Sequence, residues 1–128
     1  MNENKEYVSQ SVDNGSIRIS EDVIASIAAN AVMEVEGVYG LNNMISAELA
    51  GKIGKKTPGR GIRLAIAENN EISIDCYVVV LYGHSVFDVA KNVQENVMNV
   101  VESTTGQKVK NVNVSISGIS LPKEAKKQ

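Results

Sequence analysis

The sequence is poor in the residues that hold metals and covalent cross-links, since its 128 residues include one cysteine and one histidine. Cys76 has no second cysteine to pair with, which excludes an internal disulfide framework and a cysteine-based metal cluster. Together with His84 it supplies too few ligands for a zinc site, and the carboxylates are spread singly along the chain. We therefore expect no metal and no cofactor, and a reducing compartment.

Long hydrophobic runs are also absent from the sequence. Residues 1–12 carry Glu3, Lys5 and Glu6 and lack the apolar core that a signal peptide needs. No later stretch is long and apolar enough to cross a bilayer as a helix. The protein is therefore expected to stay in the cytoplasm.

What the chain does contain is the composition of a folded protein, with 43% hydrophobic and 22% charged residues. A chain of this length has room for one core and buries roughly two-thirds of the surface that it exposes when unfolded. We expect a single domain over residues 15–119, between a flexible N-terminal tail at residues 1–14 and a flexible charged C-terminal tail at residues 120–128.

The first half of this domain begins with a strand and a helix. Ile17 and Ile19 alternate over residues 16–19, and Ser20 then supplies an oxygen that can cap the N-terminus of a helix. The two acids that follow Ser20 favour the positive end of the helix dipole. Apolar residues then recur at helical spacing, so we predict a helix over residues 20–35, ended by Gly37, and a short strand over residues 38–41.

The second half predicts a hairpin, a helix and a strand. Alternating residues 62–67 and 71–82 are joined by Asn69 and Asn70, which is a hairpin signal. Valines at helical spacing predict a helix over residues 85–105 that is capped by Ser85 and stopped by Gly106. A strand over residues 109–119 follows. The order predicts an α+β fold, a small mainly antiparallel sheet with both helices packed on one face.

Two groups of residues have the letters of a catalytic site without the required pattern. His84, Ser85 and Asp88 are the residue types of a serine hydrolase, but neighbours at a helix start point in different directions, and a helix cap accounts for Ser85 and Asp88. Cys76 falls on the apolar face of its strand, where we expect a buried and unreactive thiol. The sequence thus predicts a protein that is not an enzyme.

Positive charge gathers in one glycine-rich segment. Its members are Lys52, Lys55, Lys56, Arg60 and Arg63, and no acid lies between them. The segment is either a solvated loop or a surface for an anionic partner. Its Gly-Lys-Ile-Gly run at residues 51–54 resembles the loop of nucleic-acid-binding KH domains, but Pro58 interrupts the helix that such a loop needs, and the net charge is -2. A nucleic-acid-binding module using loop 51–63 is therefore the alternative reading, and nucleic acid is not the partner that we expect.

The outward face of the longest strand carries a stripe made of Tyr77, Val79 and Leu81, with Ala65 and Ala67 on the neighbouring strand. Two helices on one side of a sheet leave the other side open. The stripe is then either packed under the segment at residues 42–61 or exposed for another protein. We expect self-association through this stripe.

Five blocks of sequence together resemble one known family. They read GSIRISEDVI at residues 15–24, VEGVYG at 35–40, ISIDCYVVVLYG at 72–83, VAKNVQENV at 89–97 and VNVSISGI at 112–119. The set is similar to the alkaline shock protein and Gls-type general stress protein family, the envelope stress response family of Gram-positive bacteria. Residues 84–87 depart from the usual start of the second helix in that family, although the capping pattern survives.

The resemblance implies a non-enzymatic protein linked to cell-envelope stress. In some members of the family the protein is held beneath the membrane by a small membrane-anchored partner and self-assembles, and other short members are associated with fatty-acid and phospholipid metabolism. We therefore expect a scaffold protein that acts through protein–protein contacts near the membrane. Its expected partners are a second copy and either a small membrane-anchored protein or an anionic membrane surface, which would place it peripherally at the inner face of the membrane.

Overall fold

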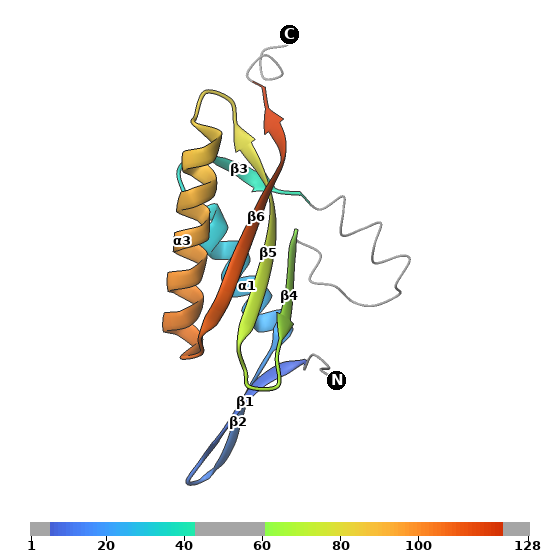
Figure 1. Cartoon of the computed structure of the whole chain (residues 1–128), viewed down its shortest axis with the longest axis vertical. Helices are drawn as coiled ribbons and strands as arrows, with labels where there is room; N and C mark the ends of the chain where they lie inside the picture. Colours follow the sequence, from blue (N-terminus) through green and yellow to red (C-terminus); the bar gives the residue numbers. More distant parts are fainter. Residues whose placement is uncertain (1–5, 43–60, 122–128) are drawn as a thin grey trace, which may run out of the picture.

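A computed structural model describes residues 6–42 and 61–121 of the chain. Strands β1 (Tyr7–Val12) and β2 (Gly15–Ser20) lead into helix α1 (Glu21–Met33) and strand β3 (Val38–Leu41). Strands β4 (Ile62–Ile66) and β5 (Ile72–Leu81), helix α3 (Val86–Thr105) and strand β6 (Val109–Ser120) complete the described elements (Figure 1). The predicted α+β class, with both helices and the short strand at residues 38–41, is confirmed.

Strand β5 is the centre of the main sheet. β6 pairs with it in parallel along its whole length, from Ile72 opposite Val109 to Leu81 opposite Ser120. β3 and β4 both pair antiparallel with the other edge of β5, one beyond the other along the strand. The β5–β6 pairing is parallel because α3 crosses over between the two strands, and such a crossover returns the chain in its original direction. Two of the three pairings in this sheet are antiparallel.

Both helices cover the same face of the sheet, as the sequence predicts (Figure 1). Alternate residues of β5 point into this layer and are fully buried together with residues of α1 and α3. The β5 members of the core are Ile72, Ile74, Cys76, Val78 and Val80. Asn96 of α3 joins the helices directly, since its Nδ2 donates to the backbone oxygen of Ala31 at 2.8 Å. The core is therefore a single layer between sheet and helices.

The helix ends follow the predicted capping chemistry. Ser20 Oγ accepts a hydrogen bond from the N–H of Val23 at 3.3 Å, and Ser85 Oγ accepts one from the N–H of Asp88 at 3.4 Å. Gly106 ends α3 in the left-handed region with φ 74°. In α3 the buried valines recur at helical spacing, which overrides the low helix propensity of valine.

The N-terminus differs from the prediction of a flexible tail over residues 1–14. Residues 7–12 form β1, which pairs antiparallel with β2, and Val8 is buried opposite Ile19. The Asn70 side chain also holds this hairpin to the β4–β5 turn, because its Nδ2 donates to the Ser9 oxygen at 2.8 Å. The missed signal is the run Asp-Asn-Gly at residues 13–15, a group of turn-forming residues between two alternating segments. The C-terminal strand also runs to Ser120, one residue into the predicted tail.

Candidate functional site

The outer face of the sheet, opposite the helices, carries the predicted stripe. Tyr77 and Val79 of β5 are half-buried there and Leu81 is exposed. Both neighbours of Val79 in the sheet are glycines, Gly40 on β3 and Gly118 on β6. Among the described residues, the outer face is therefore open beside Val79, because neither neighbouring strand places a side chain there.

The two glycines are not required by packing inside the described part of the chain. A Cβ atom added to Gly40 would meet no heavy atom within 4 Å, and one added to Gly118 would lie 3.6 Å and 3.8 Å from the two methyl groups of Val79. These are open space and an ordinary van der Waals contact. Room therefore exists on the outer face that the described residues do not fill.

Polar contacts cross the outer face around the stripe. Arg63 Nη1 donates to the Tyr77 hydroxyl at 3.4 Å, and Asn113 Nδ2 donates to Asp75 Oδ1 at 2.9 Å. Asn42 Nδ2 reaches across β5 to Ser117 Oγ at 2.9 Å. Arg63 is therefore the one member of the predicted basic group that the structure places beside the predicted stripe. Lys52, Lys55, Lys56 and Arg60 lie outside the described residues.

The ends of the segment that carries those basic residues are hydrogen-bonded to the backbone of β5 at Tyr77. The Asn42 N–H donates to the Tyr77 oxygen at 2.8 Å, and the Tyr77 N–H donates to the Gly61 oxygen at 2.9 Å. One residue of β5 thus binds the last described residue before the segment and the first one after it. The sequence did not predict that the two ends of this segment meet at one residue of β5. Residues 38–41 and 62–67 are nevertheless compatible with two strands that pair with the same edge of a third.

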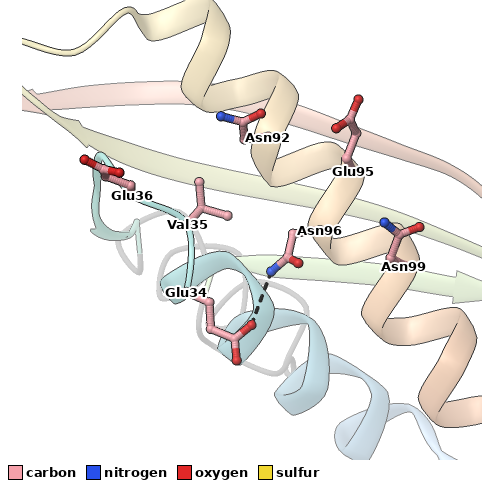
Figure 2. A pocket seen from close by; sticks show the side chains of 7 residues that line it. All are labelled: Glu34, Val35, Glu36, Asn92, Glu95, Asn96 and Asn99. Carbon is pink, nitrogen blue, oxygen red and sulfur yellow. Dashed lines mark hydrogen bonds between the residues drawn. The ribbon is translucent and has the colours of Figure 1, made fainter.

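A groove of about 400 Å³ lies on the other side of the molecule, between the end of α1 and the middle of α3 (Figure 2). Asn96 Nδ2 donates to Glu34 Oε1 at 3.3 Å across it. Its lining is mainly acidic or amide-bearing, from Glu34, Val35, Glu36, Asn92, Glu95, Asn96 and Asn99. The sequence analysis did not predict this groove, whose signal is asparagine at positions i, i+4 and i+7 of one helix.

Over the described residues, no group of His, Cys, Asp and Glu side chains is arranged to hold a metal ion.

The residues with catalytic chemistry are not brought together in the described part of the chain. Cys76 is fully buried, and burial raises the pKa of its thiol from 9.0 to about 12, with the charge of Asp75 as the smaller cause. His84 is exposed in the turn before α3, and the hydroxyl of Ser85 is occupied by the helix cap. Packing in the core accounts for Cys76, and helix capping accounts for Ser85.

Among the described residues, neither helix combines the length and the hydropathy that a membrane-spanning segment requires.

These observations define a two-layer α+β domain in which the described residues only partly cover the outer face of the sheet. The sequence profile of the alkaline shock protein family, described as having a cell envelope-related function, matches residues 9–121, and the chain belongs to this family. The family resemblance seen in the sequence is thereby confirmed, and the matched residues contain all five blocks that carry it.

Several bacterial proteins are similar over most of their length. YloU of Bacillus subtilis strain 168 is 36% identical over 109 residues, which cover 84% of this chain and 90% of YloU. YqhY of the same strain is 32% identical over 111 residues, 87% of this chain and 82% of YqhY. Spy1535 of Streptococcus pyogenes serotype M6 is 32% identical over 112 residues, 88% of this chain and 84% of Spy1535. All three carry the description "uncharacterized protein".

Among solved structures, variants of MamM CTD align with a TM-score of 0.48 at 16% identity, one of them over 76% of this chain and 93% of its own. At that TM-score the likeness carries no conclusion about this chain.

Proposed function

We propose that this protein is a non-enzymatic scaffold of the cell envelope, which works in the cytoplasm through protein–protein contacts at the inner face of the membrane. Its membership of a family with a cell envelope-related function supports the general setting. The observation that carries the proposal is the outer face of the sheet, where Val79, at the centre of the Tyr77, Val79 and Leu81 stripe, lies between two glycines that packing among the described residues does not require. An apolar stripe that the described residues only partly cover, beside space that they do not fill, is typical of a protein contact.

We assign self-association to this stripe, and a partner with an acidic surface to the basic group. Arg63 is held against Tyr77 at the margin of the stripe, and the segment that carries the other basic residues starts and ends beside the same tyrosine. Contacts made by the stripe and by Arg63 would therefore be neighbours on one face. A small membrane-anchored protein with an acidic surface fits this combination.

The test of self-association is a Val79→Lys change, because it places a charge at the centre of the stripe. Analytical ultracentrifugation of wild type over a wide concentration range is expected to show oligomers, and the variant is expected to remain monomeric. Val23→Lys is the matched control, since Val23 is 48% exposed on helix α1, away from the outer face. A wild type that stays monomeric throughout would refute this assignment.

The test of partner binding is capture from lysate separated into membrane and soluble fractions, with and without nuclease. Wild type is expected to recover a small membrane protein, and the recovery should fall as salt rises because screening weakens contacts between charges. Replacing Lys52, Lys55, Lys56 and Arg60 together with glutamate is expected to abolish recovery. If nuclease treatment abolishes the recovery, the protein binds nucleic acid, and the alternative function would replace the proposal. Loss of cellular function in Ser85→Ala or His84→Ala at an unchanged protein level would instead reopen catalysis.

A further inference from the structure

Strand β6 lies at one edge of the main sheet. Among the described residues it pairs with β5 alone, along one of its two sides. The strand runs from Val109 to Ser120, about twice the usual length, with Lys110 as its one charged residue and without proline. Charges and prolines are common means of keeping an edge strand from pairing, so β6 has little of this protection.

The register identifies the residues of β6 that face away from β5. The N–H groups of Ile72 and Tyr82 donate to the oxygens of Lys108 and Ser120, so the even-numbered residues of β5 face β6. In a parallel pair, a residue that faces its neighbour bonds to the residues before and after its own partner, and that partner faces the other way. Within the regular run of β6 these partners are Val112, Val114 and Ile116.

Helix α3 protects the first part of the outward edge. Glu102 Oε2 accepts a hydrogen bond from the Val109 N–H at 3.0 Å, and Gln94 Nε2 donates to the Val112 oxygen at 2.9 Å. The earlier residue of the strand thus meets the later residue of the helix. Helix α3 therefore lies over β6 and runs in the opposite direction.

Beyond Val112 the edge is open. No hydrogen bond among the described residues reaches the outward backbone groups of Val114 and Ile116, which we call the open edge. A bulge directly after Ile116 ends the regular pairing with β5, so the open edge is short. The side chains of Val114 and Ile116 are half-buried under the helix layer, whereas Ser115 between them is exposed on the outer face. An added strand would have an apolar side and a polar side beside it.

Phe87 lies beside the open edge, on the helix side. It precedes Gln94 by seven residues, nearly two full turns, so both side chains leave α3 on the same side. Seven helical residues span about 10 Å, as do three residues of strand, which places Phe87 level with the part of β6 that follows Val112. The start of α3 and the last part of β6 do lie at the same end of the molecule (Figure 1). At 73%, Phe87 is the most exposed large hydrophobic side chain in the described part of the chain, so the core does not account for it.

A second copy of β6 does not fit the open edge. Paired strands lie about 4.8 Å apart, so two β6 strands joined about a two-fold axis would bring the two overlying α3 helices to a similar separation. Packed helices need about 8–10 Å between their axes. An extended peptide segment has no helix above it and meets no such obstacle.

We propose that the open edge accepts an extended segment of a partner protein as an additional strand of the main sheet. The segment pairs with the backbone groups of Val114 and Ile116. Its apolar side chains contact Phe87 on the helix side, and its polar side chains lie beside Ser115 on the outer face. In such strand addition the backbone bonds give affinity and the alternate side chains give specificity. The inference rests on the proposed function through protein–protein contacts, and adds a contact that is separate from the stripe and from the basic group.

The test is fluorescence anisotropy of a labelled nine-residue peptide, in which valine and threonine alternate between terminal lysines, titrated with the full chain. Wild type is expected to bind it saturably. Phe87→Ser is expected to bind roughly tenfold more weakly, because the apolar contact of a large aromatic side chain is lost. Ile17→Ser is the matched control and should bind like wild type, since Ile17 is 56% exposed on β2 at the opposite end of the molecule (Figure 1).

Two N-methylated forms of the peptide test the backbone pairing. One carries methyl groups on its valine nitrogens, and the other carries them on its threonine nitrogens. Only alternate N–H groups of an added strand face β6, so one form is expected to lose binding and the other to keep it. This comparison needs no change in the protein, so it decides the question even if Phe87→Ser lowers the folded fraction.

Four results would overturn the inference. The first is wild type that does not bind the peptide, the second is equal binding of the two methylated forms, and the third is an equal loss of binding in Phe87→Ser and Ile17→Ser. The fourth is wild-type oligomers that excess peptide dissociates and that Val79→Lys leaves intact, which would make the open edge a contact between copies. Capture of a membrane protein by wild type would leave the proposed scaffold function standing in the first three cases, so the two can fail separately.

Discussion

The two faces of strand β5 differ sharply although they are made by alternate residues of the same ten-residue strand. The side chains that face the helices are fully buried along the entire strand. On the outer face the strand begins with polar residues, Ser73 and Asp75, and changes to Tyr77, Val79 and Leu81 in its second half. The second half of β5 is therefore apolar on both sides, but the described residues cover only one of them.

This difference separates what maintains the fold from what is available for binding. A buried face has no free volume, so its residues are fixed by the core. A half-covered apolar face beside glycines is under no such restriction, and its residue types need another explanation. The comparison predicts that substitutions of similar size will have large effects on stability at one face and small effects at the other.

The largest effect is expected at Gly37, between α1 and β3 on the helix side of the sheet. Its φ is +97°, and a Cβ atom there would lie 2.7 Å from Val89 Cγ2 and 3.1 Å from His84 Cδ2. Gly37→Ala combines backbone strain with overpacking and should cost about 3 kcal/mol or more. Urea unfolding followed by circular dichroism measures this. A loss below about 1 kcal/mol would show that the helix layer has more freedom than its burial indicates.

The most direct comparison uses Val78 and Val79, neighbours in β5 that point to opposite faces. Val78 is fully buried, so Val78→Ala should cost about 2–3 kcal/mol through lost apolar burial and the cavity left behind. Val79→Ala should cost less than about 1 kcal/mol, because Val79 is half-buried and has glycine neighbours. The same unfolding experiment serves for both. Equal costs at dilute concentration would contradict the comparison and indicate that something covers the outer face.

Much of the fold could be predicted from the sequence because local signals agreed with the tertiary structure. Alternation in residues 62–67 and 71–82 gave the hairpin, and Ser20, Ser85 and Gly106 marked helix ends that the structure confirms. The β1–β2 hairpin was missed because polar residues dilute its alternation, and its stabilising contact, from Asn70 to Ser9, joins residues 61 positions apart. A contact at that separation has no local signature.

The candidate surfaces could be predicted only in part. The stripe at Tyr77, Val79 and Leu81 followed from strand periodicity, whereas the glycines on either side of Val79 come from two other strands and depend on register. The groove between α1 and α3 likewise depends on how two helices meet.

A smaller effect, specific to the buried face, is expected from Cys76 in alkaline solution. Burial raises the pKa of its thiol from 9.0 to about 12, so the folded protein keeps the proton that the unfolded chain releases above pH 9. This contribution to stability is complete below pH 9 and is lost as the pH rises toward 12, by roughly 1 kcal/mol at pH 10, one unit above the unfolded value. The difference in unfolding free energy between wild type and Cys76→Ala should shrink accordingly from pH 8 to pH 10. A constant difference would mean that the thiol is not protected by burial.

The smallest effect is expected at Gly118, on the outer face. Its backbone does not require glycine, since its φ lies outside the left-handed region, and an added Cβ would meet Val79 at ordinary contact distance. Gly118→Ala should therefore raise the unfolding free energy slightly, by about 0.5–1 kcal/mol, because alanine loses less conformational freedom on folding. Gly106→Ala is the control, because an added Cβ there would meet no heavy atom within 4 Å but the φ is +74° at the end of α3, and it should lower the unfolding free energy by about 1 kcal/mol. If the space beside Val79 receives a second copy, the alanine variant should be at least as stable as wild type and yet self-associate more weakly. If Gly118→Ala is destabilised even as a monomer, the fold itself requires the glycine. The outer face would then not be a contact surface.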